Sequence, residues 1–304
     1  MYKSHFGLTE HPFSITPDTS FFYGHSSYQD ALNTLLVSVR CGEGFIKVVG
    51  EVGTGKTLLC RKLLASLEGG FVTAYIPNPY LEPMTLLRAV ADELGMVYDR
   101  NADQYHLLKS LTVFLVNVHA QGRGVVVCLD EAQAMPIETL EALRLLSNLE
   151  TERRKLLQVV LFGQPELDAR LDEPSIRQLR QRISFSCKLA AMSVSDVECY
   201  VAHRLWIAGY HGPRLFSQQA VRALHRASHG IPRLVNIVAH KAMIAAFGEG
   251  AHLVGVRYVQ EAIADTESTR QRLGVRRVRA LKAAAAVLGL LLVSAGMLFW
   301  GLRA

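Results

Sequence analysis

Apolar and polar positions divide the first 190 residues into two kinds of segment that alternate along the chain. Short apolar runs, which are typical of buried strands, occur at 45–49, 71–76, 125–129, 156–162 and 183–189. Before and between these runs, helical spacing of apolar positions predicts helices at 27–39, 58–64, 83–94, 103–120 and 137–149, and from Pro165 onward. Strands that alternate with helices predict an α/β fold with a parallel sheet.

The pattern changes near Ala190, after which only helical spacing is found. Helices are predicted at 193–208, 217–228, 232–247 and 256–265. Ser193 and Ser217 stand where N-cap residues are expected, and Ser26 or Ser27 has that position in the first helix. We therefore predict a core domain at 1–189, including an N-terminal arm, and a helical domain at 190–265.

The last segment is patterned for a membrane. Residues 266–282 form a polar, basic linker, and about 20 residues without a charge follow at 283–302, before a tail at 303–304. Such a stretch is long enough to cross a hydrocarbon core of about 30 Å. Because the basic block precedes it, the positive-inside rule places the preceding domains in the cytoplasm. We expect a single-pass protein of a bacterial inner membrane.

The net charge of the chain comes from its last residues and not from the part before them. The net charge is +6, but 270–282 holds six basic residues and no acidic one, and Arg303 adds a seventh. Subtracting seven from six leaves about −1 for residues 1–269. This balance gives no support to a general nucleic-acid-binding face. The five scattered cysteines have neither zinc nor C-x-x-C spacing and indicate reduced thiols.

A phosphate-binding loop follows the first predicted strand. Its eight residues fit the pattern G-x-x-x-x-G-K-[ST], and Leu58 continues into the predicted helix: Gly50, Glu51, Val52, Gly53, Thr54, Gly55, Lys56 and Thr57. Backbone N–H groups of such a loop turn onto phosphate oxygens. Lys56 is expected to reach the β- and γ-phosphates, and the Thr57 hydroxyl to ligate Mg²⁺.

Two adjacent carboxylates end the strand at 125–129, which we expect to lie beside the phosphate-loop strand. Asp130 would hold Mg²⁺, and Glu131 would orient the attacking water. Gln164 follows another strand, at the carboxyl edge of a parallel sheet where ligands bind; the alternative is a turn residue ahead of the helix from Pro165. The aromatic, Pro-rich residues 1–30 either cover an adenine ring or form a structural arm.

The order of these motifs resembles the AAA+ ATPases, and among them the general secretion pathway protein A group and the MSHA pilus biogenesis ATPases. Segments that carry the resemblance are 2–17, with its Phe-Gly-Leu and Pro-Phe, 44–57, 129–133, 143–150, 163–167 and 230–233. The resemblance implies a five-stranded core with a helical lid, active as an oligomer with ATP and Mg²⁺. Longer members of the secretion group continue beyond the membrane helix, so the short form here favours the pilus type without direct cell-wall binding.

The resemblance also implies roles for further residues. Gln164 would be the sensor-1 residue, and Arg233 the sensor-2 residue that contacts phosphate, unless it only caps its helix. Arg182 resembles the arginine finger that a neighbouring subunit supplies, with Arg180 as the alternative. Asn78 could restrain Glu131 until a partner binds.

Three functions are compatible with these motifs. The first is a membrane-anchored ATPase that assembles or remodels a pilus or a secretin-type secretion complex. The second is an ATPase of an exopolysaccharide-export or protein-sorting system. The third, a DNA-binding regulator of the transposition type, is disfavoured by the near-neutral globular part and the predicted span.

Overall fold

The computed structural model describes residues 2–150 and 155–266. They form two compact units: a sheet unit of 15–192 with 231–233, and a helical unit of 2–14, 193–230 and 234–266. No helix in these described ranges is long and apolar enough to span a bilayer. The span predicted at 283–302, the short tail after it and all but the first residue of the basic linker lie outside the described residues.

The sheet unit is built on five parallel strands in the order β2-β3-β4-β1-β5. The strands are β1 Phe45–Val49, β2 Phe71–Ile76, β3 Gly124–Leu129, β4 Gln158–Gly163 and β5 Ile183–Lys188. The expectation that β3 lies beside β1 is wrong, because β4 separates them. These three strands are mostly apolar and buried, so their side-chain pattern cannot reveal their order in the sheet.

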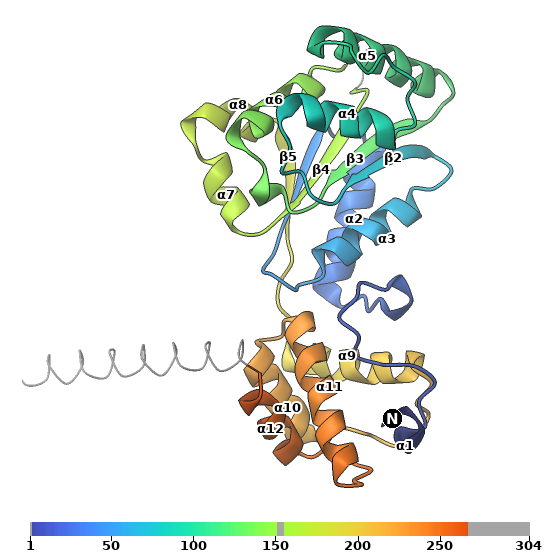
Figure 1. The fold of residues 1–304 in the computed structure, drawn as a ribbon, viewed down its shortest axis with the longest axis vertical. Coiled ribbons are helices and arrows are strands. Elements are labelled where there is room, and N and C mark those ends of the chain that lie inside the picture. The colour runs from blue at the N-terminus through green and yellow to red at the C-terminus, as the bar shows by residue number, and fades with distance from the viewer. Residues whose placement is uncertain (1, 151–154, 267–304) are drawn as a thin grey trace, which may run out of the picture. The chain divides into compact units, whose positions relative to one another are not determined.

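Helices cover both faces of this sheet (Figure 1). One face packs against α2 Ser26–Arg40 and α3 Lys56–Ser66. The other packs against α4 Pro83–Glu93, α5 Gln104–Ala120, α6 Ile137–Ser147, α7 Glu166–Leu171 and α8 Arg177–Arg180. Along β3, Val125 and Val127 point to the second face while Val126 and Cys128 point to the first, as strand alternation requires. Because the helices pack on the two faces of the sheet, the loops that follow the strands meet at its carboxyl edge.

Short 3₁₀ segments complete the sheet unit: η1 Thr19–Phe21, η2 Ala132–Ala134 and η3 Pro174–Ile176. The helix predicted from 27 begins at Ser26, and its N-cap is His25, whose side chain makes no capping hydrogen bond. The prediction of Ser26 or Ser27 as N-cap is therefore wrong. Ser27 accepts instead a hydrogen bond of 3.3 Å from the Ala190 backbone N–H, so its hydroxyl joins distant parts of this unit.

The helical unit contains α1 Tyr2–Phe6, α9 Val194–Ile207, α10 Gln218–Ser228, most of α11 Pro232–Gly248 and α12 Val256–Ala264. Ser193 and Ser217 cap α9 and α10 as predicted, since each hydroxyl accepts a backbone N–H of the first turn. The α9 cap is reciprocal, because Asp196 bonds back to the Ser193 N–H at 3.0 Å. The second segment of this unit begins at Ser193, near the predicted boundary at Ala190.

The first residues of the chain lie in the helical unit rather than with the sheet, where the sequence prediction had placed them. Tyr2 donates or accepts hydrogen bonds with His240 at 2.9 Å and with His11 at 3.1 Å. Buried Arg204 bonds the Pro12 carbonyl, and the Ser14 carbonyl at 3.3 Å. Apart from the Tyr2–His11 bond, these contacts join positions about 190 to 240 residues apart, which a local sequence pattern cannot predict.

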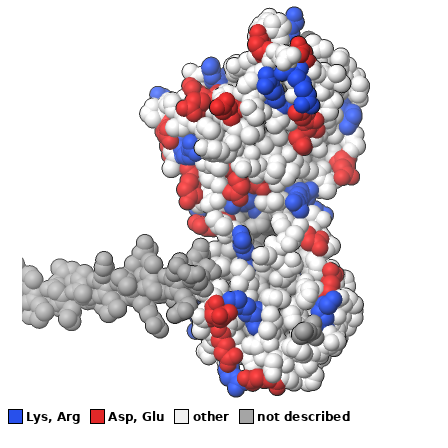
Figure 2. Space-filling model, in the orientation of Figure 1, with Lys and Arg blue, Asp and Glu red and all other residues white. Residues whose placement is uncertain are grey.

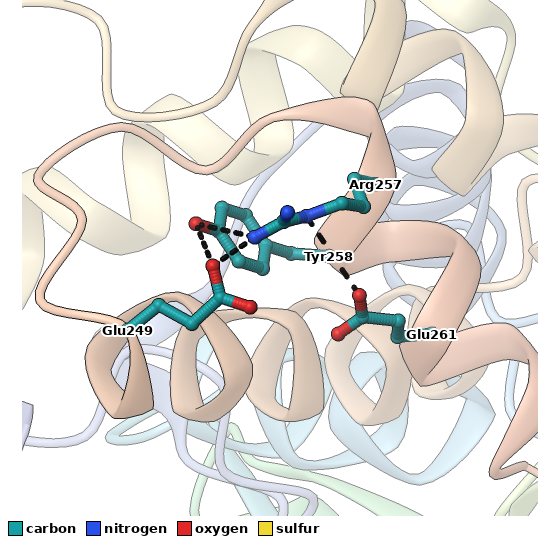
Figure 3. Close-up of polar contacts among 4 residues, drawn as sticks. All are labelled: Glu249, Arg257, Tyr258 and Glu261. Atoms are coloured by element: carbon teal, nitrogen blue, oxygen red, sulfur yellow. Dashed lines mark hydrogen bonds and ion pairs between the residues drawn. The ribbon is translucent and has the colours of Figure 1, made fainter.

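Arg257 fixes the connection between α11 and α12, as Figure 3 shows. It pairs with Glu249 at the end of α11, contacts Glu261 one turn along α12 at 3.8 Å, and stacks 4.9 Å from the Tyr258 ring. The Tyr258 hydroxyl donates to Glu249 at 3.1 Å. Because Arg257 is largely exposed, this network contributes orientation more than stability.

Positive and negative side chains are intermixed on the face of each unit that Figure 2 shows. In the sheet unit, examples of paired charges are Lys47 with Asp168 and Arg180 with Asp172. The described residues on that face therefore present no broad surface of one charge.

Candidate nucleotide-binding site

The phosphate-binding loop connects β1 to α3, as the sequence predicted. Gly53 and Gly55 have φ angles of +84° and +94°, which residues with a side chain rarely adopt. A Cβ on Gly53 would lie 2.7 Å from Arg233 Cβ, and one on Gly55 would lie 3.0 Å from the Tyr28 hydroxyl. The loop is thus packed closely on both sides, and only glycine fits at these two positions.

Lys56 is buried within this loop. Its ammonium donates hydrogen bonds to the carbonyl oxygens of Gly50 at 2.9 Å and Glu51 at 3.1 Å. Burial lowers the pKa of Lys56, and the negative charges of Glu131 and then Asp130 oppose that effect most strongly. A buried ammonium among carbonyl groups and carboxylates, at the N-terminus of α3, is suited to receive the phosphates of a nucleotide.

Thr57 and Asp130 form the pair predicted to hold Mg²⁺. The Thr57 hydroxyl donates to Asp130 Oδ2 at 2.6 Å, and the Tyr75 hydroxyl donates to the same oxygen at 3.3 Å. Burial and then the charge of Asp130 raise the pKa of Tyr75 well above its usual range, which keeps it a donor.

Hydroxyl and carboxylate oxygens are the ligands Mg²⁺ prefers, usually with phosphates and water completing its shell. Asp130 is nearly fully buried, at 2% exposure, and thus prepositioned. Among the described residues no cluster of three or more His, Cys, Asp or Glu could hold a metal alone. The Thr57–Asp130 pair offers one hydroxyl and one carboxylate ligand of the kind that Mg²⁺ prefers.

Glu131 stands next to this pair in an unusual conformation. Its φ angle is +52°, in the left-handed region, which costs a non-glycine residue of the order of 1–3 kcal/mol. Its Oε2 atom accepts hydrogen bonds from Gln164 Nε2 at 3.0 Å and from Gln133 Nε2 at 2.6 Å. The structure thus brings the predicted residues Glu131 and Gln164 into direct contact at the ends of β3 and β4.

Arg233 contacts the loop through its backbone. Its N–H donates to the Gly53 carbonyl at 3.2 Å, which places the start of α11 on the phosphate-binding loop. The Arg233 side chain is exposed. The structure thus puts this predicted residue beside the loop without assigning its guanidinium a contact to phosphate.

The two finger candidates differ in their surroundings. Arg180 pairs with Asp172 at 2.7 Å, and both side chains are exposed. Arg182 lies just before β5, where Lys155 and, to a smaller extent, Arg182 lower the pKa of Glu150. A role for Arg182 across a subunit interface stays a prediction.

Asn78 does not contact Glu131 in the structure. Its side chain is exposed and accepts the Tyr80 backbone N–H at 3.2 Å. The proposed restraint of Glu131 by Asn78 is therefore wrong for this conformation, because the turn after β2 directs Asn78 to its own backbone. The amides of Gln133 and Gln164 bind Glu131 instead.

Sequence reasoning also missed three residues around the site: Gln133, Tyr75 and Tyr28. Gln133 follows Glu131 by two positions and closes the segment 129–133 of the family resemblance, and those were its available signals. Tyr75 lies on β2 and Tyr28 on α2, where the latter bonds the Gly55 carbonyl. Neither tyrosine follows a motif that could have indicated this contact.

Comparison with known proteins agrees with this geometry. Residues 39–171 match the model of a family described as the AAA domain. These residues therefore form an AAA domain. The matched region includes the loop, Asp130, Glu131 and Gln164, and such a domain implies nucleotide binding of the P-loop type.

The chain is similar to general secretion pathway protein A of Aeromonas hydrophila, with 45% identity over 254 residues. The alignment covers 84% of this chain and 46% of that protein, so the chain spans about half the length of this relative.

Solved structures resemble this chain in fold alone. Cdc6p from Pyrobaculum aerophilum has a TM-score of 0.61 at 16% identity, covering 86% of this chain and 70% of that one. The ORC2 protein of Aeropyrum pernix, solved as ADPNP–ADP complexes, has a TM-score of 0.58 at 19% identity, covering 83% and 72%.

Proposed function

We propose that this protein is an ATPase that binds ATP with Mg²⁺ and hydrolyses it to ADP and phosphate. The observation that carries the proposal is the arrangement at the ends of β1, β3 and β4. There a buried Lys56, the Thr57–Asp130 pair and the Glu131–Gln164 pair occupy one edge of the sheet. In parallel α/β sheets this edge is where ligands bind.

Each residue has a task in that reaction. Lys56 exchanges its two carbonyl partners for phosphate oxygens and offsets negative charge as the terminal phosphoryl group leaves. Thr57 and Asp130 would hold Mg²⁺, which when bound neutralises charge on the phosphates. Glu131 orients the attacking water and polarises it toward the γ-phosphorus, and Gln164 holds the carboxylate. The bond from water oxygen to phosphorus forms as the bond to the ADP oxygen breaks.

The nucleotide state would be read by the contact between α11 and the loop. Because the Arg233 N–H bonds the Gly53 carbonyl, any rearrangement of the loop by phosphate acts directly on the first turn of α11. The Arg233 guanidinium, which is exposed, would turn toward the phosphates as a sensor. Hydrolysis would thereby bias a helix that continues into the other unit.

We further propose that hydrolysis drives assembly or remodelling of a cell-envelope complex, in a secretion or pilus system. The similarity to general secretion pathway protein A over most of this chain supports this biological role. The apolar stretch predicted at 283–302 would anchor an oligomer in the inner membrane with its AAA domain in the cytoplasm. Arg182 would complete the site of a neighbouring subunit in that oligomer.

Affinity purification from native membranes tests the role. Glu131→Gln is expected to trap the ATP-bound protein with its partners, and the control is the double variant that also carries Lys56→Ala. Recovery of secretion or pilus components with the single variant only would support the proposal. Nucleotide-dependent recovery of nucleic acid, or of polysaccharide-export proteins, would contradict the envelope-assembly role and leave the ATPase intact.

A further inference from the structure

Gln133 bonds three separate elements around the candidate catalytic carboxylate. From η2, its side-chain Nε2 donates to Glu131 Oε2 at 2.6 Å, and its Oε1 accepts the Gln164 backbone N–H at 2.9 Å. Its own carbonyl accepts a hydrogen bond of 2.6 Å from Arg170 Nη1 on α7. One partly buried side chain and its backbone thus join the ends of β3 and β4 to α7.

The direction of the Gln133 amide follows from its partners. The Gln164 backbone N–H can only donate, so it requires the amide oxygen of Gln133. The amide nitrogen must then face Glu131, and a nitrogen donor suits a carboxylate oxygen. Gly163 allows this approach, because a Cβ there would lie 3.3 Å from Gln133 Oε1 and 2.6 Å from Leu167.

Both amide donors bond the same oxygen of Glu131. Gln133 and Gln164 share Oε2, and Oε1 has no hydrogen-bond partner among the residues that the structure describes. Because the left-handed backbone at Glu131 is strained, its side chain needs such anchors to hold one orientation. One oxygen is thus fixed while the other stays available.

We propose that Gln133 is a positioning residue for ATP hydrolysis: it anchors Glu131 Oε2, so that Oε1 orients the attacking water. The proposal rests on the proposed ATPase function. Through its second bond Gln133 also sets the position of Gln164 relative to Glu131, and Arg170 holds the Gln133 backbone in place. In this role Gln133 acts through its bonds to Glu131 and Gln164 and not on the reacting atoms themselves.

Two substitutions test the donor and the acceptor of the Gln133 side-chain amide. Gln133→Glu keeps an acceptor for the Gln164 N–H but replaces the donor to Glu131 with a negative charge. Gln133→Leu removes both. The matched control is Gln178→Leu, an exposed glutamine on α8. Each variant of the full chain is assayed for kcat, for KM, and for binding of a fluorescent ATP analogue.

We expect kcat to fall about ten- to hundredfold in both Gln133 variants, which corresponds to losing a hydrogen bond to a charged group. KM and analogue affinity are expected to change less than about twofold, since the phosphate contacts are intact. Gln178→Leu should match the wild type. In a Glu131→Gln background, Gln133→Glu should lower the remaining rate less than about twofold, because the carboxylate it positions is gone.

The outcomes distinguish the positioning role from the proposed function. Wild-type kcat in Gln133→Glu and Gln133→Leu, with Glu131-dependent hydrolysis in the wild type, would overturn the positioning role alone. Equal losses from Gln133→Glu with and without the Glu131 carboxylate would also overturn it, since that pattern indicates a general structural effect. A wild-type protein without Glu131-dependent hydrolysis would overturn both proposals.

Discussion

Replacing Gly53 with alanine tests whether the loop and the start of α11 form one packed unit. The added Cβ would meet Arg233 Cβ at 2.7 Å and Ile231 Cγ2 at 3.2 Å. A contact below 3.0 Å with an atom attached directly to the backbone cannot be relieved by rotating a flexible side chain. The Arg233 N–H bond to the Gly53 carbonyl would therefore stretch or break.

Gly122→Ala provides a matched control. Gly122 also has a positive φ, +75°, but a Cβ there would have no atom within 4 Å. Both substitutions carry the left-handed cost of about 1 kcal/mol. Gly53→Ala adds overpacking, typically about 1–3 kcal/mol. We expect unfolding free energies lower by about 1 kcal/mol for Gly122→Ala and about 2–4 kcal/mol for Gly53→Ala.

Denaturant unfolding measures these two losses, and titration with a fluorescent ATP analogue measures the function of the loop. Analogue affinity should fall at least about tenfold in Gly53→Ala, because the N–H groups that face phosphate move with the loop. Gly122→Ala should bind normally, since it lies in the turn before β3. Equal stability of the two variants together with wild-type affinity in Gly53→Ala would refute the packing argument.

Three further predictions concern the metal pair, the subunit interface and the helical unit. Thr57→Ala should weaken Mg²⁺-dependent ATP binding about tenfold or more, while Thr57→Ser, which keeps the hydroxyl, should retain it; equal magnesium titrations would contradict the assigned pair. Mixing Arg182→Ala with Lys56→Ala subunits should restore some phosphate release, because each lesion lies in a different half of a shared site; no recovery in demonstrably mixed oligomers would argue against a finger. Burial and then the charge of His11 lower the pKa of His240, so the neutral form is favoured in the fold and protons bind preferentially to the unfolded chain. Stability should therefore fall as pH drops below the ordinary value of 6.5, and Trp206 fluorescence during denaturation should show this dependence weakened in His240→Gln.

Local pattern predicted the strands, the phosphate-binding loop and the caps Ser193 and Ser217. These features depend on neighbouring residues: a glycine loop between a strand and a helix specifies its own geometry, and a serine before a helix caps it. The position of Gln164 at the carboxyl end of a parallel strand was also predicted, but its hydrogen bond to Glu131 was not.

Long-range packing decided what the sequence could not predict. The position of β4 between β1 and β3 could not be predicted from the sequence, because all three strands are mostly apolar and their side-chain patterns do not differ in a way that gives their order. Tyr2 forms a hydrogen bond with His240, and most of the chain lies between these two residues in the sequence. At the site, Gln133 rather than Asn78 contacts Glu131. Glu131 has a left-handed backbone, and Gln133, two residues later, donates its side-chain amide to the Glu131 carboxylate.

The most direct test of the ATPase proposal is phosphate release by the purified full-length chain, measured beside binding of a fluorescent ATP analogue. The account predicts Mg²⁺-dependent turnover in the wild type. It predicts loss of both binding and turnover in Lys56→Ala, and retained binding with at least about hundredfold slower turnover in Glu131→Gln. Turnover at the wild-type rate in Lys56→Ala or Glu131→Gln would contradict the assignment of the site.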